Sequence, residues 1–411
     1  MDTGPVVIVG TGHAGLEAAA ALRAEGQTRP VVLVGAETSP PYTRPPLSKG
    51  YLTGQVRQDE LWLRPESFFA EQRITTVFGD RAVEIDRDAC QVGLVSGRRI
   101  TYDRLILATG ARPRRLSVPG ADLEGVVALR SLSDAEGLRC ALREAGDLLV
   151  VGGGFVGLEV ASVARRPGLR VTVLESGPRL MSRSVSEPVS AHLLALHRAE
   201  GTRVLLSKEL AALRGEKGRV RGAELNDGSH VAADVVVVGI GALPDTALAA
   251  QTELRTGDGV IVDRWLRTSD RNVYAIGDCA RFPSPHAPHP VRLESLQNAS
   301  DQARCVAATL SGQPRPYTSV PWFWTEQCGV RVQMAGITRG HDRAVVTGSP
   351  DAGRFSVFCF RDGRLVGAES VNQSAHHMIT RRLLASGATG PAPDDVARPG
   401  FDIRRHGVRP E

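Results

Sequence analysis

The hydrophobic pattern of the chain contains the same short unit twice. Residues 6–15 read VVIVGTGHAG and residues 148–157 read LLVVGGGFVG. Each is an uninterrupted apolar run, typical of a buried strand, that ends in GxGxxG and leads into a stretch of helix-forming residues. The two runs therefore predict two strand–turn–helix units of the same design.

A helix and a second strand complete each unit. The first helix is predicted over residues 16–26, and a second apolar strand comes after it at 31–35. The second helix is predicted over 158–166, ending at Pro167, and its next strand lies at 171–174. Both segments are βαβ units, so the sequence predicts two nucleotide sites.

Three later segments, 104–110, 233–245 and 272–280, each combine an apolar strand with a glycine turn. Residues 321–411 change character: short alternating stretches such as RVQMAG and RFSVFCF predict antiparallel strands, and AHHMITRRLLASG predicts one helix. The proline-rich stretch 283–290 is predicted to be a loop, and 390–411 a weakly ordered tail.

These elements predict an α/β fold with two Rossmann-like dinucleotide-binding domains and a C-terminal α+β domain. One nucleotide domain is nested inside the other. Residues 1–112 and 241–320 form the first, residues 113–240 the second, and residues 321–411 the third domain.

Composition narrows the class of protein. The chain has 411 residues, 42% of them hydrophobic, which suits two or three domains of an enzyme. No apolar run approaches the roughly 18 residues of a membrane span, and no basic-then-apolar segment opens the chain. We therefore expect a cytoplasmic protein without a membrane association.

The cysteines and charges exclude further classes. Six cysteines are scattered without CxxC or CxxxxC spacing, so neither a metal site nor a redox disulfide is predicted. The net charge of +5 favours an acidic partner, and no basic run with interleaved aromatics predicts nucleic-acid binding.

The first glycine motif has the chemistry of a pyrophosphate site. Gly10 permits a tight turn, Gly12 lets a phosphate approach backbone N–H groups at the helix N-terminus, and Gly15 lets helix and strand pack. Glu37, just after the next strand, is placed to bind a ribose diol.

The second motif repeats this logic with Gly152, Gly154 and Gly157, and Glu175 closes its next strand. A carboxylate there accepts hydrogen bonds from the adenosine ribose hydroxyls and repels a 2′-phosphate. The sequence therefore favours NADH over NADPH, although Arg179 and Arg183 follow closely and would weaken the preference.

Several longer segments resemble a known family. Together with the two glycine motifs, ATGARP (108–113) and YAIGDCA (274–280) resemble the FAD-dependent pyridine nucleotide–disulfide reductase superfamily. More closely, PPYTRPPLSKGYL (40–52), RLESLQNASDQAR (292–304) and PWFWTEQ (321–327) are similar to the ferredoxin and rubredoxin reductases of cytochrome P450s and ring-hydroxylating dioxygenases. The resemblance implies that the first glycine motif holds FAD and the second NAD.

The resemblance also implies roles for matching residues. Asp278 matches an aspartate that bonds the flavin ribityl chain, although a helix N-cap is the alternative explanation for an acid there. Other FAD-contacting positions are implied at His13, Ala14, Arg44, Lys49, Ala82, Val83, Ala108, Thr109, Gly110, Arg130, Gly277, Glu294, Ser295, Leu296 and Trp324. NAD-contacting positions are implied at Phe155, Val156, Glu159 and Gly241.

Lys49 and Glu159 are the predicted catalytic residues. Lys49 lies in PPLSK, where the disulfide-using relatives carry their redox CxxxxC and where this chain has no cysteine. A cation near flavin N5 and O4 stabilises the negative charge that develops when hydride arrives. Glu159, in the first turn of the second helix, is placed to reach Lys49 and the nicotinamide carboxamide. The alternatives are a surface lysine and a glutamate favoured by a helix N-terminus.

Other conspicuous residues receive plainer interpretations. The spacing of Trp322 and Trp324 fits core aromatics on a strand as well as the implied place beside the flavin. His13 is interpreted as a spacer, His376 and His377 as hydrogen-bonded or solvated, and Cys279 and Cys328 as inert. Cys328 and Gly329 depart from the family pattern, which has Tyr and Asp there.

The sequence thus predicts an FAD-dependent NADH:ferredoxin reductase. Hydride passes from NADH to FAD, and single electrons then pass to an acidic [2Fe–2S] ferredoxin that serves a cytochrome P450 or dioxygenase; Arg304 is a candidate contact. Three alternatives remain at this point: a flavin NADH oxidase or peroxidase, a reductase of rubredoxin, a quinone or an ascorbate radical, and a redox-sensing binding protein similar to apoptosis-inducing factor.

Overall fold

The computed structural model describes residues 4–165 and 167–406. The chain forms two compact units, each assembled from three segments. Unit 1 consists of residues 1–43, 59–112 and 243–321, and unit 2 of residues 44–58, 113–242 and 322–411. β8 (Ala111–Pro113) and β17 (Ala242–Pro244), where the chain passes from one unit to the other, pair as a two-stranded sheet.

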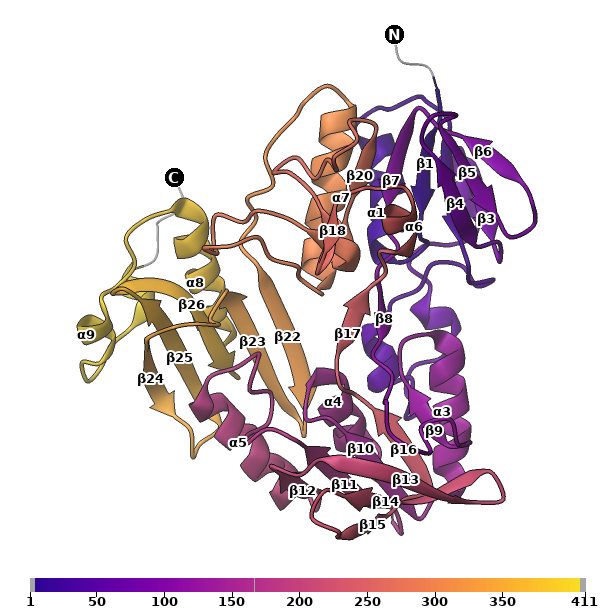
Figure 1. Ribbon diagram of the computed structural model, residues 1–411. Helices are drawn as coiled ribbons and strands as arrows, with labels where there is room; N and C mark the ends of the chain where they lie inside the picture. The colour runs from indigo at the N-terminus through magenta and orange to yellow at the C-terminus, as the bar shows by residue number, and fades with distance from the viewer. Residues whose placement is uncertain (1–3, 166, 407–411) are drawn as a thin grey trace. The chain divides into compact units, whose positions relative to one another are not determined.

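Unit 1 is built on a five-stranded parallel sheet with the strand order β20-β7-β1-β2-β3 (Figure 1). All four residues of the central strand β1 are buried, as expected for a parallel strand covered on both faces. The strands are β1 (Val6–Val9), β2 (Val31–Gly35), β3 (Ile74–Phe78), β7 (Arg104–Leu107) and β20 (Val273–Ala275).

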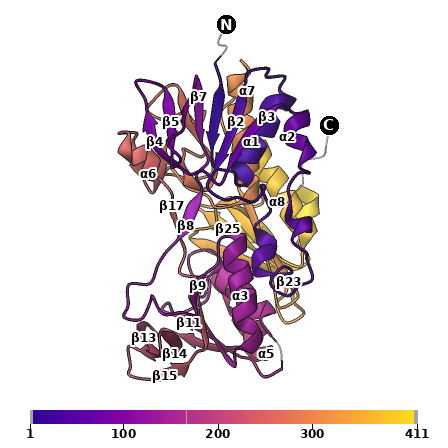
Figure 2. The ribbon, with the colours of Figure 1, turned by 90° about the vertical axis from the view of Figure 1, so that its right-hand side faces the viewer.

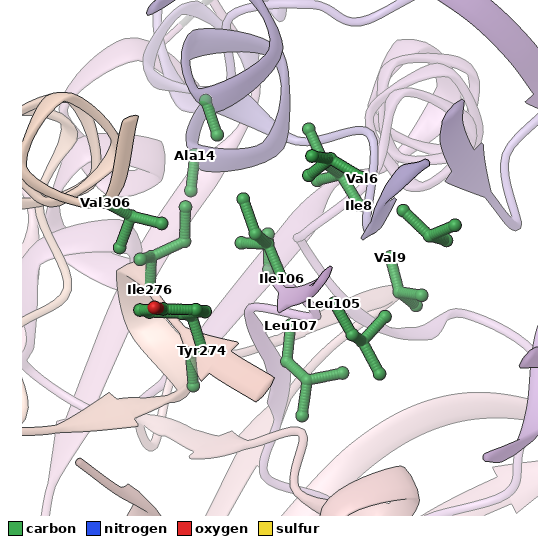
Figure 3. Close-up of a cluster of buried hydrophobic side chains, with 14 of the residues drawn as sticks. Val6, Ile8, Val9, Ala14, Leu105, Ile106, Leu107, Tyr274, Ile276 and Val306 are labelled. Carbon is green, nitrogen blue, oxygen red and sulfur yellow. The ribbon is translucent and has the colours of Figure 1, made fainter. Parts of the chain in front are cut away.

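Two helices, α1 (His13–Ala24) and α7 (Leu296–Leu310), lie beside each other against this sheet (Figure 2). Figure 3 shows their shared core, in which Ala14 of α1 and Val306 of α7 face side chains of β1, β7 and β20. The remaining elements of unit 1 are η2 (Asp59–Leu61), α2 (Ser67–Glu71), β4 (Ala82–Asp86), β5 (Gln91–Leu94), β6 (Arg99–Thr101), α6 (Ala247–Gln251), β18 (Thr256–Gly257), β19 (Gly259–Ile261), η3 (Gly277–Cys279) and β21 (Ala280–Arg281).

Unit 2 repeats the arrangement with a parallel sheet of order β12-β11-β10-β16-β9. Its strands and helices are η1 (Pro45–Ser48), β9 (Val126–Ala128), α3 (Leu132–Glu144), β10 (Asp147–Val151), α4 (Phe155–Val163), β11 (Arg170–Glu175), α5 (Glu187–Ala199), β12 (Arg203–Leu206) and β16 (Val235–Val238). An antiparallel sheet of β13 (Leu210–Glu216), β14 (Arg219–Leu225) and β15 (His230–Ala232) belongs to the same unit.

The C-terminal part of unit 2 is an antiparallel sheet of order β22-β23-β26-β25-β24 with helix α8 (Ser374–Ser386). Its strands are β22 (Trp322–Gln327), β23 (Val330–Gly336), β24 (Arg343–Ser349), β25 (Arg354–Arg361) and β26 (Arg364–Val371). Val332, Phe355 and Val357 of this sheet share one hydrophobic core with Leu158 and Val173 of the parallel-sheet region.

The structure corrects our prediction of a weakly ordered tail. Residues 393–406 contain α9 (Pro393–Val396) and η4 (Ile403–His406), and the side chains of Val396 and Ile403 are buried against Phe358. Two apolar residues seven positions apart were too sparse to indicate this in the sequence. Residues 407–411 lie outside the described part of the chain.

Both predicted helices after the glycine motifs begin three residues earlier than expected. α1 begins at His13 and α4 at Phe155, so the third glycine of each motif lies inside the first turn of its helix. α4 ends at Val163; Pro167 lacks the N–H that would continue the helical hydrogen bonding.

The predicted loop at 283–290 carries no helix or strand. In the described residues, no helix is long and apolar enough to span a bilayer. The three-domain division remains a prediction.

Candidate functional site

In the first glycine turn, in unit 1, two glycines are required by close packing and one is not. Gly10 has a φ of 117°, and a Cβ there would lie 2.1 Å from the carbonyl oxygen of Ala108. A Cβ at Gly15 would lie 1.8 Å from the carbonyl oxygen of Gly10. Gly12, the N-cap of α1, is different, because a Cβ there would meet no described atom within 4 Å.

The open space above Gly12 indicates whether unit 1 can accept a dinucleotide. The fold itself requires Gly10 and Gly15, but it does not require Gly12. The N-terminus of α1, where free N–H groups and the helix dipole favour an anion, opens at Gly12. The residues present therefore fit a pyrophosphate that approaches the backbone at this position.

The strand order of unit 1 brings two further groups of predicted FAD positions, 108–110 and 277–278, to the same edge of the sheet. β7 pairs with β1 and β20 pairs with β7, all in parallel, so their carboxyl ends, followed by 108–110 and 277–278, lie at the edge where Gly10 ends β1. A Cβ at Gly277 would come 2.9 Å from the Cβ of Ala14 in α1. Thr109 is held by a hydrogen bond from its Oγ1 to the carbonyl oxygen of Asp245, at 2.6 Å.

Asp278 lies in the short helix η3 and is not its N-cap, which is Ile276. The backbone N–H of Gly277 donates to Gln302 Oε1 of α7 at 2.7 Å, which fixes the turn against that helix. The N-cap alternative for Asp278 is therefore wrong; its side chain is half-buried, and the preceding Gly277 lies against Ala14 at the beginning of α1.

Segment 294–296 begins helix α7. Ser295 is its N-cap and accepts a hydrogen bond from the N–H of Asn298 at 3.1 Å. Arg292 Nη1 donates to Glu294 Oε1 at 2.5 Å and to the carbonyl oxygen of Asp278 at 3.2 Å. One guanidinium thus connects two predicted FAD positions.

Glu37, two residues after β2, accepts a hydrogen bond from Tyr42 Oη at 2.5 Å. The backbone N–H groups of Gly79 and Asp80 donate to the carbonyl oxygens of Glu37 and Gly35. This pairing places the beginning of β4, with Ala82 and the 42% exposed Val83, beside the segment that carries Glu37.

His13 is the first residue of α1, and its Nε2 lies 2.8 Å from Ser300 Oγ of α7. Burial lowers the pKa of His13, so a neutral ring is favoured. The histidine connects two helices, a role that our interpretation as a spacer did not include.

The second glycine turn, in unit 2, has the same design as the first. Gly152 has a φ of 105°, and a Cβ there would lie 2.5 Å from the carbonyl oxygen of Gly239. A Cβ at Gly157 would lie 2.5 Å from the oxygen of Gly152, whereas a Cβ at Gly154 would be 3.6 Å from its nearest atom. The middle glycine is again the one with space above it.

Glu175, at the end of β11, already holds this turn. Its Oε2 accepts the N–H of Gly153 and its Oε1 the N–H of Gly177, both at 2.7 Å. Arg179 donates to the carbonyl oxygens of Ser182 and Val185 and so is committed to its own loop. The carboxylate therefore faces the beginning of α4, where an adenosine ribose would lie.

Gly241 has a φ of 100°, which favours glycine, and a Cβ there would lie 3.6 Å from Nη2 of the exposed Arg183. Val156, in the first turn of α4, is 39% exposed, as a ligand-contacting residue can be. The ring of Phe155 packs edge-on against Phe323 of β22, with centroids 4.6 Å apart.

Lys49 and Glu159, far apart in sequence, meet in unit 2. Lys49 Nζ lies 2.6 Å from Glu159 Oε2, and the two side chains are 20% and 6% exposed. Ser48 Oγ also donates to Oε2, at 2.6 Å, and Thr325 Oγ1 donates to Oε1, at 2.7 Å. Three of the roughly four acceptor positions of the carboxylate are thus occupied by the protein.

Sequence reasoning missed Ser48 and Thr325. The signal for Ser48 was its place in the PPLSK motif, next to Lys49. The signal for Thr325 was its spacing of two residues from Phe323, which puts both on one face of a strand. Arg44 Nη1 donates to the carbonyl oxygen of Arg130 at 2.6 Å, so these two predicted FAD positions also lie together. Arg130 is in turn held by its N–H to Asp134 Oδ2, at 3.1 Å.

Trp324 is half-buried and lies 5.5 Å, between ring centroids, from Trp322. Strand alternation puts both tryptophans on the face of β22 opposite to Phe323 and Thr325, which contact α4. Cys328 and Gly329 form the tight turn between β22 and β23, with φ values of 50° and 72°.

Of the two adjacent histidines and two cysteines interpreted from the sequence, His377 alone differs from our interpretation. His376 Nδ1 lies 3.0 Å from Ser356 Oγ, as expected, but His377 is 1% exposed and neither ring nitrogen has a partner among the described residues. Packing against Trp322 at 5.8 Å overrides its polar preference. Burial raises the pKa of Cys279 and Cys328, so both thiols favour the unreactive protonated form.

Two parallel sheets, each with an open glycine turn and an acid at the end of its second strand or just after it, have the pattern of two dinucleotide-binding units. The chain belongs to the pyridine nucleotide-disulphide oxidoreductase family, whose sequence profile matches residues 4–303. Residues 322–406 match the reductase C-terminal family. FAD and NAD(H) are the cofactors that this membership implies.

Individual relatives cover nearly the whole chain. Rhodocoxin reductase from Rhodococcus erythropolis is 48% identical, over 97% of this chain and 93% of the relative. A crystal structure of a ferredoxin reductase from Rhodopseudomonas palustris has a TM-score of 0.95 and 42% identity, covering 98% of this chain and 100% of that chain. The covalent putidaredoxin reductase–putidaredoxin complex gives a TM-score of 0.94 and 36% identity, covering 98% and 97%.

Proposed function

We propose that this chain is an FAD-dependent NADH:ferredoxin reductase that supplies single electrons to an acidic [2Fe–2S] ferredoxin serving a cytochrome P450 or another oxygenase. The observation that carries the proposal is the Lys49–Glu159 pair, formed where a disulfide-using relative needs cysteines. The similarity to rhodocoxin reductase and to the putidaredoxin reductase complex supports the same partner class.

FAD, when bound, supplies the chemistry of accepting a hydride and releasing electrons one at a time. Residues 1–112 and 241–320 would hold it: Gly12 admits the pyrophosphate, Glu37 accepts from the ribose, and Asp278 accepts from a ligand hydroxyl. The other FAD-contacting positions named from the sequence, including Arg44, Arg130 and Trp324, belong to the same proposal.

Residues 113–240 would hold NADH, and residues 321–411 would form the third domain. Gly154 admits the second pyrophosphate, and Glu175 accepts from the adenosine ribose and repels a 2′-phosphate. Lys49 provides a fixed positive charge for the electron pair that arrives with the hydride, and Glu159 keeps that ammonium in place. The remaining acceptor position on Glu159 suits the amide N–H of a nicotinamide.

The proposal includes a cytoplasmic location, where NADH is produced and where the six free cysteines remain reduced. The net charge of +5 favours encounter with an acidic ferredoxin, and Arg304, which is exposed, is a candidate contact. Such encounter should slow as salt rises, because exposed charges are screened beyond roughly 8 Å at physiological ionic strength.

Anaerobic stopped-flow absorbance tests the proposal. The purified protein is mixed with NADH or NADPH, and then with a [2Fe–2S] ferredoxin at several salt concentrations, alongside Lys49→Ala. Lys208→Ala is the matched control, because Lys208, just before β13, pairs with the exposed Asp227 between β14 and β15. We expect fast bleaching by NADH, salt-sensitive ferredoxin reduction, and a slower Lys49→Ala only.

Other outcomes of this experiment would favour one of the alternative functions or refute the proposal. A protein that bleaches with NADH but reduces no iron–sulfur acceptor would be a reductase of rubredoxin or a quinone, or a redox-sensing binding protein. A protein that binds no flavin would refute the proposal altogether.

A further inference from the structure

We propose that Thr325, Gln327 and His197 are positioning residues, which fix the Glu159 carboxylate through a buried chain of hydrogen bonds that runs in one direction. The inference rests on the proposed function, because it assigns these residues to the Lys49–Glu159 pair. It extends that function into the C-terminal sheet and helix α5 of unit 2.

The contacts form an unbroken line. Thr325 Oγ1 donates to Glu159 Oε1 at 2.7 Å, Gln327 Nε2 lies 3.1 Å from Thr325 Oγ1, and Gln327 Oε1 lies 3.1 Å from His197 Nε2. Thr325 and His197 are 0% exposed and Gln327 is 1% exposed. The line is closed to water along its length, so each link depends on the next.

Three secondary-structure elements hold the line. Glu159 lies on α4 and His197 on α5, while Thr325 and Gln327 stand two residues apart on β22 and so share one face of the strand. β22 is hydrogen-bonded along its length to β23, which fixes both side chains in register. A strand of the C-terminal sheet therefore connects two helices of the parallel-sheet region.

The chemistry of the groups sets the direction. A carboxylate oxygen accepts hydrogen bonds, so the single hydroxyl hydrogen of Thr325 is used on Glu159. The hydroxyl must then accept from Gln327, which turns the amide nitrogen toward Thr325 and the amide oxygen toward His197. The second amide hydrogen of Gln327 faces Met181 Sδ at 3.8 Å, which fits the same orientation.

His197 ends the line as a donor. Because the amide oxygen of Gln327 accepts, the proton of the His197 ring must lie on Nε2. Its Nδ1 has no partner among the described residues, which suits an unprotonated nitrogen better than a buried N–H. Burial lowers the pKa of His197, which favours the neutral ring that this arrangement needs.

The consequence concerns the orientation of Glu159. Ser48 and Lys49 both hold Oε2, and Thr325 alone among the described residues holds Oε1. Without the Thr325 hydroxyl, Oε1 loses the contact that fixes it, and the carboxylate is less restrained in rotation about its Cγ–Cδ bond. The acceptor position that we assign to the nicotinamide would then lose its direction.

The experiment uses the flavin-loaded protein in two measurements. The first is the NADH dependence of anaerobic flavin bleaching for Thr325→Val, which keeps the shape, Thr325→Ser, which keeps the hydroxyl, and Gln327→Met. Ser370→Ala is the matched control, because Ser370 is a buried hydroxyl of the same C-terminal sheet that bonds Ser356 and not Glu159. Lys49→Met and Glu159→Gln are measured in parallel.

The second measurement is the ¹⁵N chemical shifts of the histidine rings, with the His197 signals assigned by His197→Gln. It reports the tautomer directly and is independent of turnover. In the unaltered protein we expect a neutral ring protonated on Nε2, and in Thr325→Val a mixture of tautomers, because Gln327 can then reverse its amide.

We expect Thr325→Val to bleach at least tenfold more slowly at low NADH, Thr325→Ser and Ser370→Ala to remain within twofold, and Gln327→Met to fall between. A His197 ring protonated on Nδ1, or Thr325→Val equal to Ser370→Ala while Glu159→Gln is slow, would overturn the inference. If Lys49→Met and Glu159→Gln are also fast, the proposed role of the pair fails, and the tautomer still decides whether the directed line exists. Should Thr325→Val not fold, the unaltered tautomer and Gln327→Met decide it.

Discussion

Lys49 Nζ and Glu159 Oε2 lie 2.6 Å apart, and the pair joins a short helix near the beginning of the chain to helix α4 in the middle. Glu159 is 5% exposed, so the carboxylate has little access to solvent. A pair of this kind is costly to break from one side, since the remaining charge stays buried without its partner.

Replacing one member of the pair should therefore cost both rate and stability. We expect Lys49→Met and Glu159→Gln each to slow flavin bleaching by about 10- to 100-fold, because a charge at the reacting centre is lost. The double variant should be no worse than the poorer single variant, as residues in contact are not additive. A double-mutant cycle on the bleaching rate checks this. Fully additive effects would show that the two residues act separately.

Gly12→Ala should separate cofactor binding from folding. A Cβ at Gly12 meets nothing within 4 Å, so we expect the unfolding free energy of the flavin-free protein to change by no more than about 1 kcal/mol. FAD affinity should fall at least about tenfold, or roughly 1.4 kcal/mol, because the methyl group occupies the space assigned to the pyrophosphate. Equilibrium titration with FAD and urea unfolding of the apoprotein measure the two quantities.

Gly15→Ala is the comparison for that prediction. Its Cβ would lie 1.8 Å from the oxygen of Gly10, so the apoprotein itself should lose about 2–3 kcal/mol or fail to accumulate. If Gly12→Ala binds FAD with unchanged affinity, the pyrophosphate does not lie at this turn.

Glu175→Gln should weaken the preference for NADH. Loss of one negative charge near a 2′-phosphate is worth about 1 kcal/mol in partly screened surroundings, or roughly five- to tenfold. We expect the ratio of kcat/KM for NADH to that for NADPH to fall by that factor. Exposed Glu209→Gln provides the control. An unchanged ratio would mean that Glu175 only holds the Gly153 turn.

His377 predicts how stability depends on pH. Burial, and then the charges of Arg381 and Arg331, lower the pKa of His377 to about 4 from its usual 6.5. The unfolded chain therefore takes up the proton first, and the contribution of His377 is present above pH 6.5 and lost as pH falls from 6.5 to about 4. The full effect is at most about 3 kcal/mol.

His377→Phe keeps an aromatic ring at this position and removes the group that takes up the proton. We expect its unfolding free energy in urea to fall less steeply between pH 6.5 and 4.5 than that of the unaltered protein. Replacing the exposed His289 by Asn should leave the slope as it is. Parallel slopes for His377→Phe and the unaltered protein would contradict the prediction.

Much of the fold could be inferred from local pattern. The runs at 6–9 and 148–151 are apolar on both faces and end in glycine motifs, so the strands, the turns and the family resemblance could be inferred from neighbouring residues alone. The helix beginnings were placed late, because the glycines of each motif were assigned to the turn when the third belongs to the helix.

The candidate site was only partly predictable. Lys49 and Glu159 were identified because each stands in a motif, whereas Thr325, Gln327 and His197 carry no local signal. Threonine and glutamine on an alternating strand are ordinary residues, and a single histidine on a helix usually has no chemical role. His377 shows the same limit, since its packing against Trp322 could not be read from its neighbours in sequence.

The amino-acid sequence by itself determined the two nucleotide units, the acids after their second strands and the lysine in a segment without cysteines, because each depends on residues close together along the chain. The tertiary structure alone decided which hydroxyls hold Glu159, that a hydrogen-bonded line leads from it to a buried histidine, and that residues 393–406 pack against the C-terminal sheet. Those features depend on residues brought together by burial, and burial is a property of the whole fold, which no local pattern specifies.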